Sequence, residues 1–197
     1  MPELKKGTAV LVTGTPGTGK TAVSRLLATE LRASYIEPNI LLRREGIPYR
    51  YDEKRKTRIV SVERLRIALR KQAARADRGL VIGSHVALGA GPLPKLVRVV
   101  VLRCNPIVLE QRLERKRWPK SKIGENLQAE ILDICLWDAV RKYGWNRVLE
   151  IDTTGKVARH VVELIMKDLR KKRIQNQPTV NWLLDLKRRG ILARYLD

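Results

Sequence analysis

A glycine-rich run with the spacing of a phosphate-binding loop lies near the beginning of the chain. Residues 10–21 read VLVTGTPGTGKT, in which Gly14, Gly19, Lys20 and Thr21 match the pattern G-x-x-x-x-G-K-[ST]. Small residues allow successive backbone N–H groups to surround a phosphate, and the positive end of the following helix points at the same anion. An apolar run before the loop and a helical pattern after it provide the context that this motif requires. The sequence therefore predicts a P-loop that binds a nucleoside triphosphate.

The loop also indicates which side chains contact the ligand. Lys20 is expected to reach the β- and γ-phosphates, which makes it a candidate catalytic residue, and the hydroxyl of Thr21 is expected to bind Mg²⁺. The residues of the loop and the first helical turn that we expect to bind ATP are Gly17, Thr18, Gly19, Lys20, Thr21 and Ala22.

Two more residues are candidates for catalysis on the same phosphates. His85 follows an apolar run at 79–83, and ligands gather at the carboxyl ends of parallel strands. Its alternative role is that of a hydrogen-bonded histidine at the end of a strand. Arg112 precedes a run rich in lysine and arginine, so it is a candidate to bind phosphate. Its alternative role is that of a solvated charge on a helix.

The remaining chain supplies the elements that must position these residues. Apolar runs separated by helical periodicity predict an α/β fold of the P-loop NTPase type, with a five-stranded parallel sheet and helices on both faces. The predicted strands are 10–12, 34–37, 79–83, 97–102 and 147–151. The predicted helices are 21–32, 40–45, 60–76, 106–115, 125–143 and 157–172, with a further short one at 180–189. Residues 47–57 are polar and aromatic, and Pro48 excludes a helix there.

The predicted organisation is one kinase-like domain at 1–173 followed by a C-terminal appendage at 174–197. Within the domain, residues 37–60 can cover a phosphate acceptor, and the basic segment 115–125 can act as a short lid that closes over the phosphates. The helix of the appendage carries Trp182, Leu183 and Leu186, which could dock on the core.

Composition excludes several classes of protein. No run of about 18 apolar residues is present, so nothing is expected to span a membrane, and we expect a cytoplasmic protein. The two cysteines, Cys104 and Cys135, lie in apolar patterns and are expected to be buried rather than to form a disulfide. Two histidines are too few to favour a zinc centre. The guanine-recognition pattern N/T-K-x-D of GTPases does not occur.

The chain is strongly basic, with 41 Lys and Arg against 20 Asp and Glu and a formal charge of +21. The excess is clustered: residues 43–78 contain thirteen basic and five acidic residues, 112–122 six and one, and 167–189 eight and two. Such clustering favours a nucleic-acid partner. The alternative is that the charge only keeps the protein soluble.

Several runs together resemble a known family. These are the P-loop GTPGTGKT, YDE at 51–53, RLERKRW at 112–118, IGENLQAEILDI at 123–134 and IDTTGK at 151–156. In this order they look like the atypical adenylate kinases of the isoenzyme-six (CINAP) type, over residues 8 to about 170. The resemblance implies an adenylate-kinase-like fold, activity with ATP, ADP and AMP, ATPase activity, and Mg²⁺. It also implies a role in maturation of the small ribosomal subunit, with a platform ribosomal protein and rRNA as partners.

The chain departs from the family pattern in two places. The family has D-x-H after the third strand, whereas this sequence reads Gly83-Ser84-His85, so the histidine is kept and the carboxylate is missing. Mg²⁺ would then be held by Thr21, phosphate oxygens and water, with Glu37 as a candidate to assist. Lys116 stands where adenylate kinases usually have the second arginine of the lid, so it is expected to bind ATP without the bidentate fork of arginine.

Two functions stay open at this point. The protein could be an enzyme that moves a phosphoryl group between adenine nucleotides or to water. Alternatively, it could be a nucleotide-dependent assembly factor that binds a ribosomal protein and rRNA, with little kinase activity.

Overall fold

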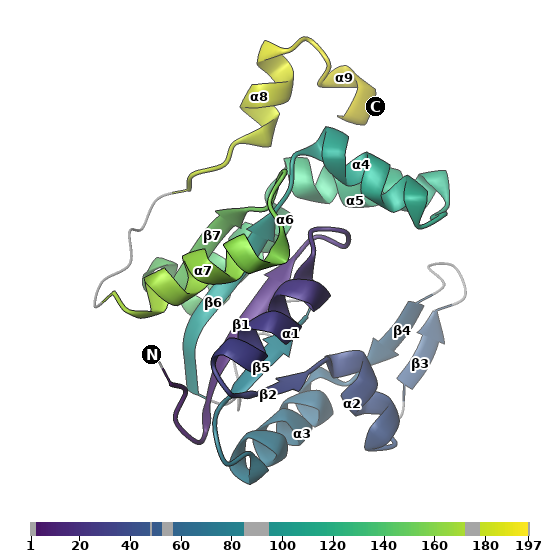
Figure 1. Ribbon diagram of the computed structural model, residues 1–197. Helices are drawn as coiled ribbons and strands as arrows, with labels where there is room; N and C mark the ends of the chain where they lie inside the picture. The colour runs from purple at the N-terminus through teal and green to yellow at the C-terminus, as the bar shows by residue number, and fades with distance from the viewer. Residues whose placement is uncertain (1–2, 48, 53–56, 85–94, 172–177, 197) are drawn as a thin grey trace.

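The central sheet contains the five strands that the sequence predicts. The computed structural model describes residues 3–47, 49–52, 57–84, 95–171 and 178–196, and the strands of its main sheet are all parallel. These strands are β1 (Thr8–Gly14), β2 (Ser34–Ile36), β5 (Leu80–Gly83), β6 (Lys95–Arg103) and β7 (Val148–Asp152). Their order, β2-β5-β1-β6-β7, places β1 in the middle (Figure 1). The loop after β1 therefore leaves the sheet at the centre of the carboxyl edge, where ligands gather in such sheets.

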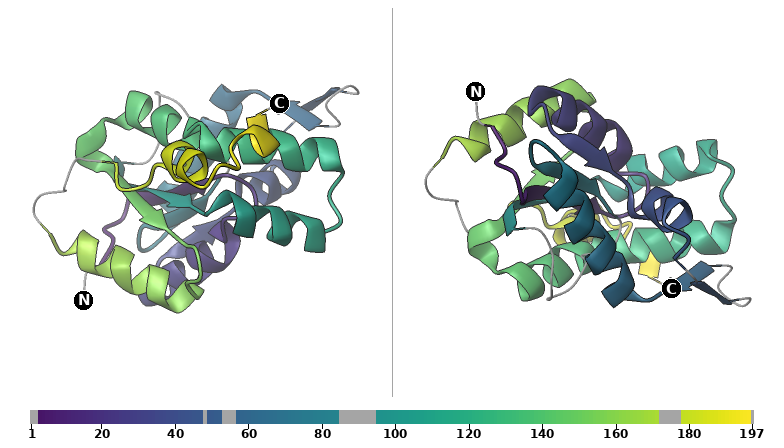
Figure 2. Two further views of the ribbon diagram at one scale, coloured as in Figure 1. Left: turned by 90° about the horizontal axis from the view of Figure 1, so that it is seen from above. Right: turned by 90° about the horizontal axis from the view of Figure 1, so that it is seen from below.

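Helices cover both faces of this sheet, as Figure 2 shows from two sides. The helices are α1 (Lys20–Glu30), α2 (Pro38–Arg44), α3 (Val62–Arg75), α4 (Pro106–Arg115), α5 (Lys120–Ile131), α6 (Ile134–Tyr143), α7 (Ala158–Leu169), α8 (Trp182–Arg188) and α9 (Ala193–Leu196). Ala9 and Leu11 of β1 belong to a core with α2, α3 and α6, whereas Val10 and Val12 belong to a core with α1 and α7. Both faces are buried, which explains why the strands are apolar almost throughout. The predicted α/β P-loop fold is confirmed.

A two-stranded hairpin was not predicted. β3 (Tyr49–Asp52) pairs antiparallel with β4 (Thr57–Val60) in a separate small sheet. The prediction of an irregular segment at 47–57 is therefore wrong for this part. Pro48 excludes a helix but is compatible with a strand that begins beside it. The proline therefore does not distinguish an irregular segment from a strand.

The predicted helix 125–143 is divided into α5 and α6. The break is at Asp133, whose φ of 56° is left-handed, a conformation that aspartate tolerates better than most residues. Apolar periodicity continues across the break, and this is why the sequence suggested one helix. The two halves face different partners: α5 packs with α4 and the C-terminal segment, and α6 packs on the sheet. In addition, α5 begins at Lys120, inside the segment 115–124 that was predicted to be a break.

The C-terminal helices α8 and α9 close a third apolar cluster, which lies beyond the carboxyl edge of the sheet (Figure 1). Trp182 and Leu186 are buried among side chains of α4 and α5, as the sequence suggested. Leu183 is 39% exposed, so its predicted docking is wrong. The partner side chains in the core are Leu109, Leu113, Ile123, Leu127 and Ile131.

We expect Trp182→Ala to lower the free energy of unfolding by about 3–5 kcal/mol, the usual cost of emptying a buried tryptophan site. Trp182 is 9% exposed, and its indole N–H donates to the buried Glu130 carboxylate. Leu184→Ala is the matched control on the same helix, because Leu184 is 39% exposed and should change stability by only about 0.5 kcal/mol. Urea unfolding followed by circular dichroism measures both variants. Equal stability of the two variants would contradict the docking of α8.

Candidate active site

The P-loop has a backbone that only glycine can supply at two positions. Gly14 has φ 137°, and a Cβ there would lie 2.3 Å from the carbonyl oxygen of Leu102 on the neighbouring strand. Gly17 has φ 95°, and its Cβ would lie 2.7 Å from Cδ1 of Leu109 in α4. The loop is thus pressed against β6 and α4, which fixes the path of its backbone.

Lys20 bends back onto the loop that precedes it. Its Nζ donates hydrogen bonds to the carbonyl oxygens of Gly14 at 2.8 Å and Thr15 at 3.0 Å. Burial lowers the pKa of Lys20 from 10.5 to about 8, although nearby groups such as Glu130 and Glu37 oppose this shift. The ammonium group therefore lies inside the loop and is poorly solvated, which favours a bound anion.

We expect the affinity for a nucleoside triphosphate to fall as the pH rises above about 8. The pKa of Lys20 is about 8 without ligand, and a triphosphate beside the amine favours its charged form and raises this pKa. Binding then takes up a proton, so affinity should fall by up to about tenfold per pH unit. The free energy of unfolding of the free protein should instead rise with pH between about pH 8 and 10.5. In this range the unfolded chain binds more protons than the folded protein, because Lys20 has its ordinary pKa of 10.5 only when unfolded.

Calorimetric titration with ATP in buffers of different ionisation enthalpy measures both the affinity and the proton uptake. A pH-independent affinity, with no proton taken up above pH 8, would contradict the assigned role of Lys20.

Arg112 joins two segments at the carboxyl edge of the sheet. Its guanidinium donates to the carbonyl oxygens of Gly17 and Thr153, both at 3.4 Å. The hydroxyl of Thr153 in turn donates to the carbonyl oxygen of Thr18 at 3.1 Å. Because these bonds are long, the guanidinium can exchange them for a phosphate oxygen. The turn after β7 and the end of α4 therefore lie beside the P-loop, as a nucleotide site in this fold requires.

A small pocket of about 60 Å³ lies on the other side of the P-loop, and Lys20, Thr21, Glu37 and Gly83 belong to its lining. The phenol of Tyr35 donates to Oε2 of Glu37 at 3.2 Å. Burial, and next the negative charge of Glu37, raise the pKa of Tyr35, so the phenol stays protonated and can donate. The sequence alone identified Glu37 only as an assistant and missed Tyr35.

The structure places the remaining predicted residues as follows. Thr21 and Ala22 are exposed in the first turn of α1, Gly19 is exposed before it, and Thr18 is buried. Lys116 is exposed at the end of α4, and its positive charge contributes to the lowered pKa of Lys20. The predicted site residues therefore come together around the P-loop, except His85, which lies outside the described residues.

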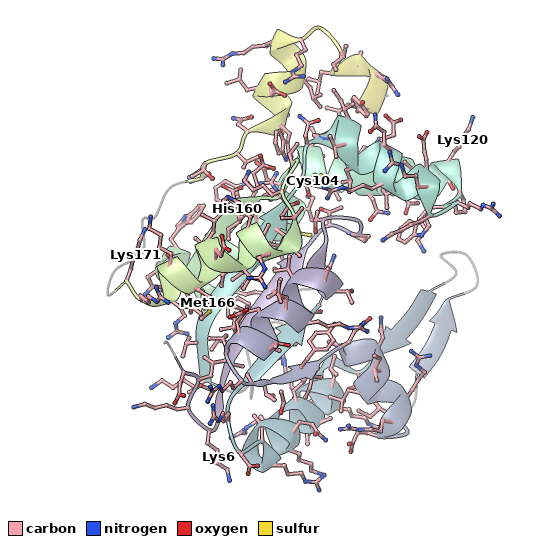
Figure 3. All side chains as sticks on the ribbon, in the orientation of Figure 1. Lys6, Cys104, Lys120, His160, Met166 and Lys171 are labelled. Atoms are coloured by element: carbon pink, nitrogen blue, oxygen red, sulfur yellow. The ribbon has the colours of Figure 1, made fainter. Side chains whose placement is uncertain are left out.

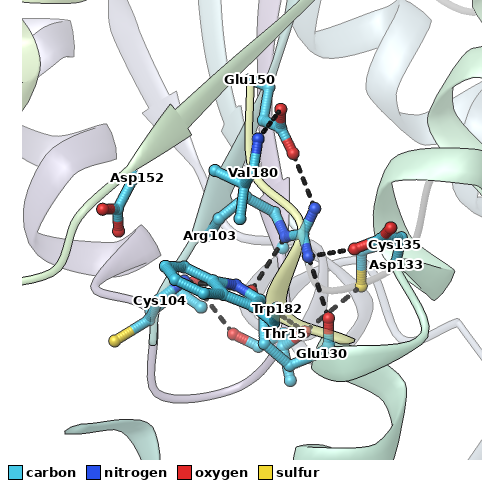
Figure 4. A network of polar contacts seen from close by, with 12 residues as sticks. Thr15, Arg103, Cys104, Glu130, Asp133, Cys135, Glu150, Asp152, Val180 and Trp182 are labelled. Carbon is cyan, nitrogen blue, oxygen red and sulfur yellow. Dashed lines mark hydrogen bonds and ion pairs between the residues drawn. The ribbon is translucent and has the colours of Figure 1, made fainter. Parts of the chain in front are cut away.

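A buried ionic network lies behind the loop (Figure 4). The guanidinium of Arg103, at the end of β6, bonds the carboxylates of Glu130 at 2.9 Å and Glu150 at 2.6 Å, and also that of Asp133. Arg103 and Glu130 are each 1% exposed. The sequence did not reveal this network, because its four members are isolated charges in separate elements.

Glu130 connects the network to the P-loop and to the C-terminal segment. Its Oε2 accepts from the hydroxyl of Thr15 at 2.5 Å, and its Oε1 accepts from the backbone N–H of Cys104 at 3.0 Å and from the indole of Trp182 at 3.1 Å. Cys135 lies at the same place, with its sulfur 3.9 Å from the Thr15 hydroxyl. Both cysteines are free; Cys104 is buried, as predicted, whereas Cys135 is only half-buried.

The described part of the chain contains no group of three or more His, Cys, Asp or Glu side chains that could hold a metal ion by themselves. Nor does any helix in the ranges given above have the length and apolar character to cross a membrane.

Two of the basic clusters lie far apart in the described part of the chain. In Figure 3, Lys120 marks the far end of α4 and α5, whereas Lys171, after α7, lies on the opposite side of the molecule. Arg112 is the member of the 112–122 cluster that contacts the P-loop by hydrogen bonding, and Arg115, Arg117 and Lys120 are exposed. Any polyanionic partner would therefore meet separate basic areas.

Comparisons with known proteins agree with this geometry. Residues 10–133 match the family model described as "AAA domain". Two archaeal relatives are both named "Putative adenylate kinase". The protein from Methanocaldococcus jannaschii is 30% identical over 88% of this chain and 92% of its own length. The protein from Natronomonas pharaonis is 39% identical over 79% of this chain and 86% of its own length.

Two of the solved structures that share this fold are a shikimate kinase and a gluconokinase. A shikimate kinase from Acinetobacter baumannii has a TM-score of 0.53 at 17% identity, over 83% of this chain and 95% of its own. A gluconokinase from Sinorhizobium meliloti 1021 has a TM-score of 0.53 at 19% identity, over 84% and 93%. At these sequence identities, the two structures show that the fold is shared.

Proposed function

The chain belongs to the AAA domain family and is an adenylate-kinase-like P-loop protein, and from this premise we propose that it transfers a phosphoryl group between adenine nucleotides. It is an ATP-binding nucleotide kinase. The reaction that we propose is ATP + AMP → 2 ADP, with slow hydrolysis of ATP when no acceptor is bound.

The proposed mechanism uses the positive groups around the loop. An oxygen of the AMP phosphate attacks the γ-phosphorus, the bond from this phosphorus to the β–γ bridging oxygen breaks, and ADP leaves. Lys20 exchanges the two carbonyl oxygens that it now contacts for oxygens of the β- and γ-phosphates. Arg112 approaches the same phosphates from α4. Positive groups fixed in this way stabilise the charge that spreads over the transferred oxygens.

Mg²⁺ fits the oxygen ligands on the other side of the loop. The Thr21 hydroxyl and the Glu37 carboxylate line one pocket with Lys20, and hydroxyl and carboxylate oxygens are the ligands that this ion prefers. When bound with the nucleotide, the ion neutralises charge on the β- and γ-phosphates.

The observation that carries the proposal is the convergence of Lys20 and Arg112 on one P-loop. A coupled assay that measures ADP formation from ATP plus AMP, compared with ATP alone, tests it. We expect AMP to accelerate ADP formation at least about tenfold, because a positioned acceptor replaces water. The same rate with and without AMP would leave the protein as an ATPase and overturn the kinase reaction.

A second candidate function is nucleotide-dependent assembly of the small ribosomal subunit in the cytoplasm, through a platform ribosomal protein and rRNA. The formal charge of +21 and the basic clusters support it. Binding to fragments of small-subunit rRNA, with and without the platform protein, should weaken steeply with salt, with a log–log slope of about −0.7 per phosphate contact. If no binding to rRNA is detected at low salt, the alternative that the positive charge only keeps the protein soluble is favoured.

A further inference from the structure

The end of β5 has no carboxylate, and Tyr35 and Ser24 lie close to Gly83 there. A Cβ added to Gly83 would lie 3.1 Å from Oγ of Ser24 and 3.2 Å from both Cε2 and the hydroxyl of Tyr35. These distances are tighter than ordinary contacts. A side chain at position 83 would therefore require Ser24 and Tyr35 to shift by a few tenths of an ångström. The ring of Tyr35 on β2 thus lies directly beside Gly83.

Tyr35 also holds a carboxylate on the neighbouring strand. β2 and β5 are parallel, with Tyr35 opposite Val81 and Ile36 opposite Ile82, so Glu37 follows in register with Gly83. Side chains two residues apart share one face of a strand, and the Tyr35 hydroxyl donates to Oε2 of Glu37. A carboxylate is consequently present at the same edge of the sheet, one strand away from Gly83.

Glu37 is the carboxylate near Lys20 that retains free oxygen capacity. Glu130, the other carboxylate that acts on Lys20, has both oxygens engaged, by Thr15 on one side and by Arg103, Cys104 and Trp182 on the other. Within the described ranges, Oε1 of Glu37 accepts no hydrogen bond. The same residue lines the pocket with Thr21 and Lys20.

We propose that Glu37, oriented by Tyr35, is the protein carboxylate of the magnesium–nucleotide site, where it binds the ion or the water molecules of its inner shell. Glu37 would supply this carboxylate from the end of β2, one strand away from Gly83. This assignment rests on the proposed nucleotide-binding function.

The test compares ATP binding with and without metal in the full-length protein. Calorimetry gives the dissociation constant of ATP in excess EDTA and in excess Mg²⁺, and electron paramagnetic resonance counts bound Mn²⁺ with a non-hydrolysable ATP analogue. The variants are Glu37→Gln and Tyr35→Phe. Glu45→Gln is the control, because Glu45 contacts Gln72 and Arg44 outside the pocket and loses the same charge.

Glu37→Gln should weaken Mn²⁺ binding about 10-fold or more, as loss of a supporting oxygen ligand does. In EDTA it should bind ATP as well as the wild type or more tightly, because a negative charge beside the triphosphate is gone. Tyr35→Phe should weaken Mn²⁺ binding less, and Glu45→Gln should match the wild type.

Three other outcomes would overturn the assignment. An unchanged metal dependence in Glu37→Gln removes the carboxylate from the metal site. If Glu37→Gln weakens ATP binding equally in EDTA and in Mg²⁺, Glu37 has a structural role. A higher KM for AMP with unchanged Mn²⁺ binding places Glu37 on the acceptor side. If the wild type binds no ATP under either condition, the proposed nucleotide-binding function itself fails, and this result is distinguishable from the other three.

Discussion

Lys20→Ala should abolish ATP binding while leaving the protein at least as stable as the wild type. The ammonium group is the charge that lies inside the P-loop, where it contacts the carbonyl oxygens of Gly14 and Thr15. A charge-assisted contact to phosphate contributes about 1.5–3 kcal/mol, and Lys20 is expected to make such contacts to two phosphates. We therefore expect the dissociation constant to rise at least about 100-fold.

Lys20→Ala should not destabilise the protein, whereas removal of a residue with a structural role would. Burial lowers the pKa of Lys20 to about 8, which means that the folded protein holds this charge at a cost at neutral pH. Removing the amine relieves this cost, so the midpoint of urea unfolding should not decrease.

Calorimetric titration with ATP and urea unfolding of the same sample provide the two measurements. Lys71→Ala, on the exposed surface of α3, is the control for loss of one positive charge and should bind ATP normally. If Lys20→Ala kept wild-type affinity, the assignment of the loop would be wrong. If it lost stability as well as affinity, a structural role would explain the result.

The sequence predicted the parts of this protein whose signals are local. The β-branched runs around Val10 and Val99 specify buried parallel strands by composition alone, and the P-loop carries its own spacing. The hairpin at 49–60 depends on pairing between two polar segments, and no apolar alternation reveals it. At the break, Asp133 contacts Arg103, thirty residues earlier in the chain, and a local pattern could not predict this contact.

The candidate site divides in the same way. Lys20 and Thr21 were predicted because one short motif contains both of them. Tyr35 and Glu37 act on this motif from another strand, and their role follows from the strand order and from the space left at Gly83. The sequence alone shows that position 83 has no carboxylate, but it does not show that Glu37 lies close enough to replace one.

Arg103→Met should cause the largest loss of stability of any single substitution that we propose. Removing one partner of a buried ion pair costs about 3–5 kcal/mol, because the other charge stays buried without compensation. Here one guanidinium compensates three carboxylates, of which Glu130 and Glu150 are 1% and 3% exposed. The free energy of unfolding should therefore fall by at least about 4 kcal/mol, which is a large part of the stability of a typical domain.

The expected pH dependence identifies the cause of this loss. Without Arg103, burial raises the pKa of each orphaned carboxylate, and the folded state then binds protons more readily than the unfolded chain. The difference in stability between Arg103→Met and the wild type should consequently shrink as the pH is lowered towards about 5. A simple packing defect would give a difference that does not depend on pH.

Two further variants separate the network from its neighbours. Arg98→Met, five residues before Arg103 on β6, breaks one buried pair with Asp168, so it should lose less stability and leave ATP affinity unchanged. Adding Glu130→Gln to Arg103→Met removes one orphaned charge and should restore part of the stability. Because Glu130 also accepts from Thr15 of the P-loop and from Trp182 of α8, we expect Arg103→Met to weaken ATP binding and to loosen the C-terminal segment together. If these two effects separate, Glu130 does not connect the C-terminal segment to the nucleotide site.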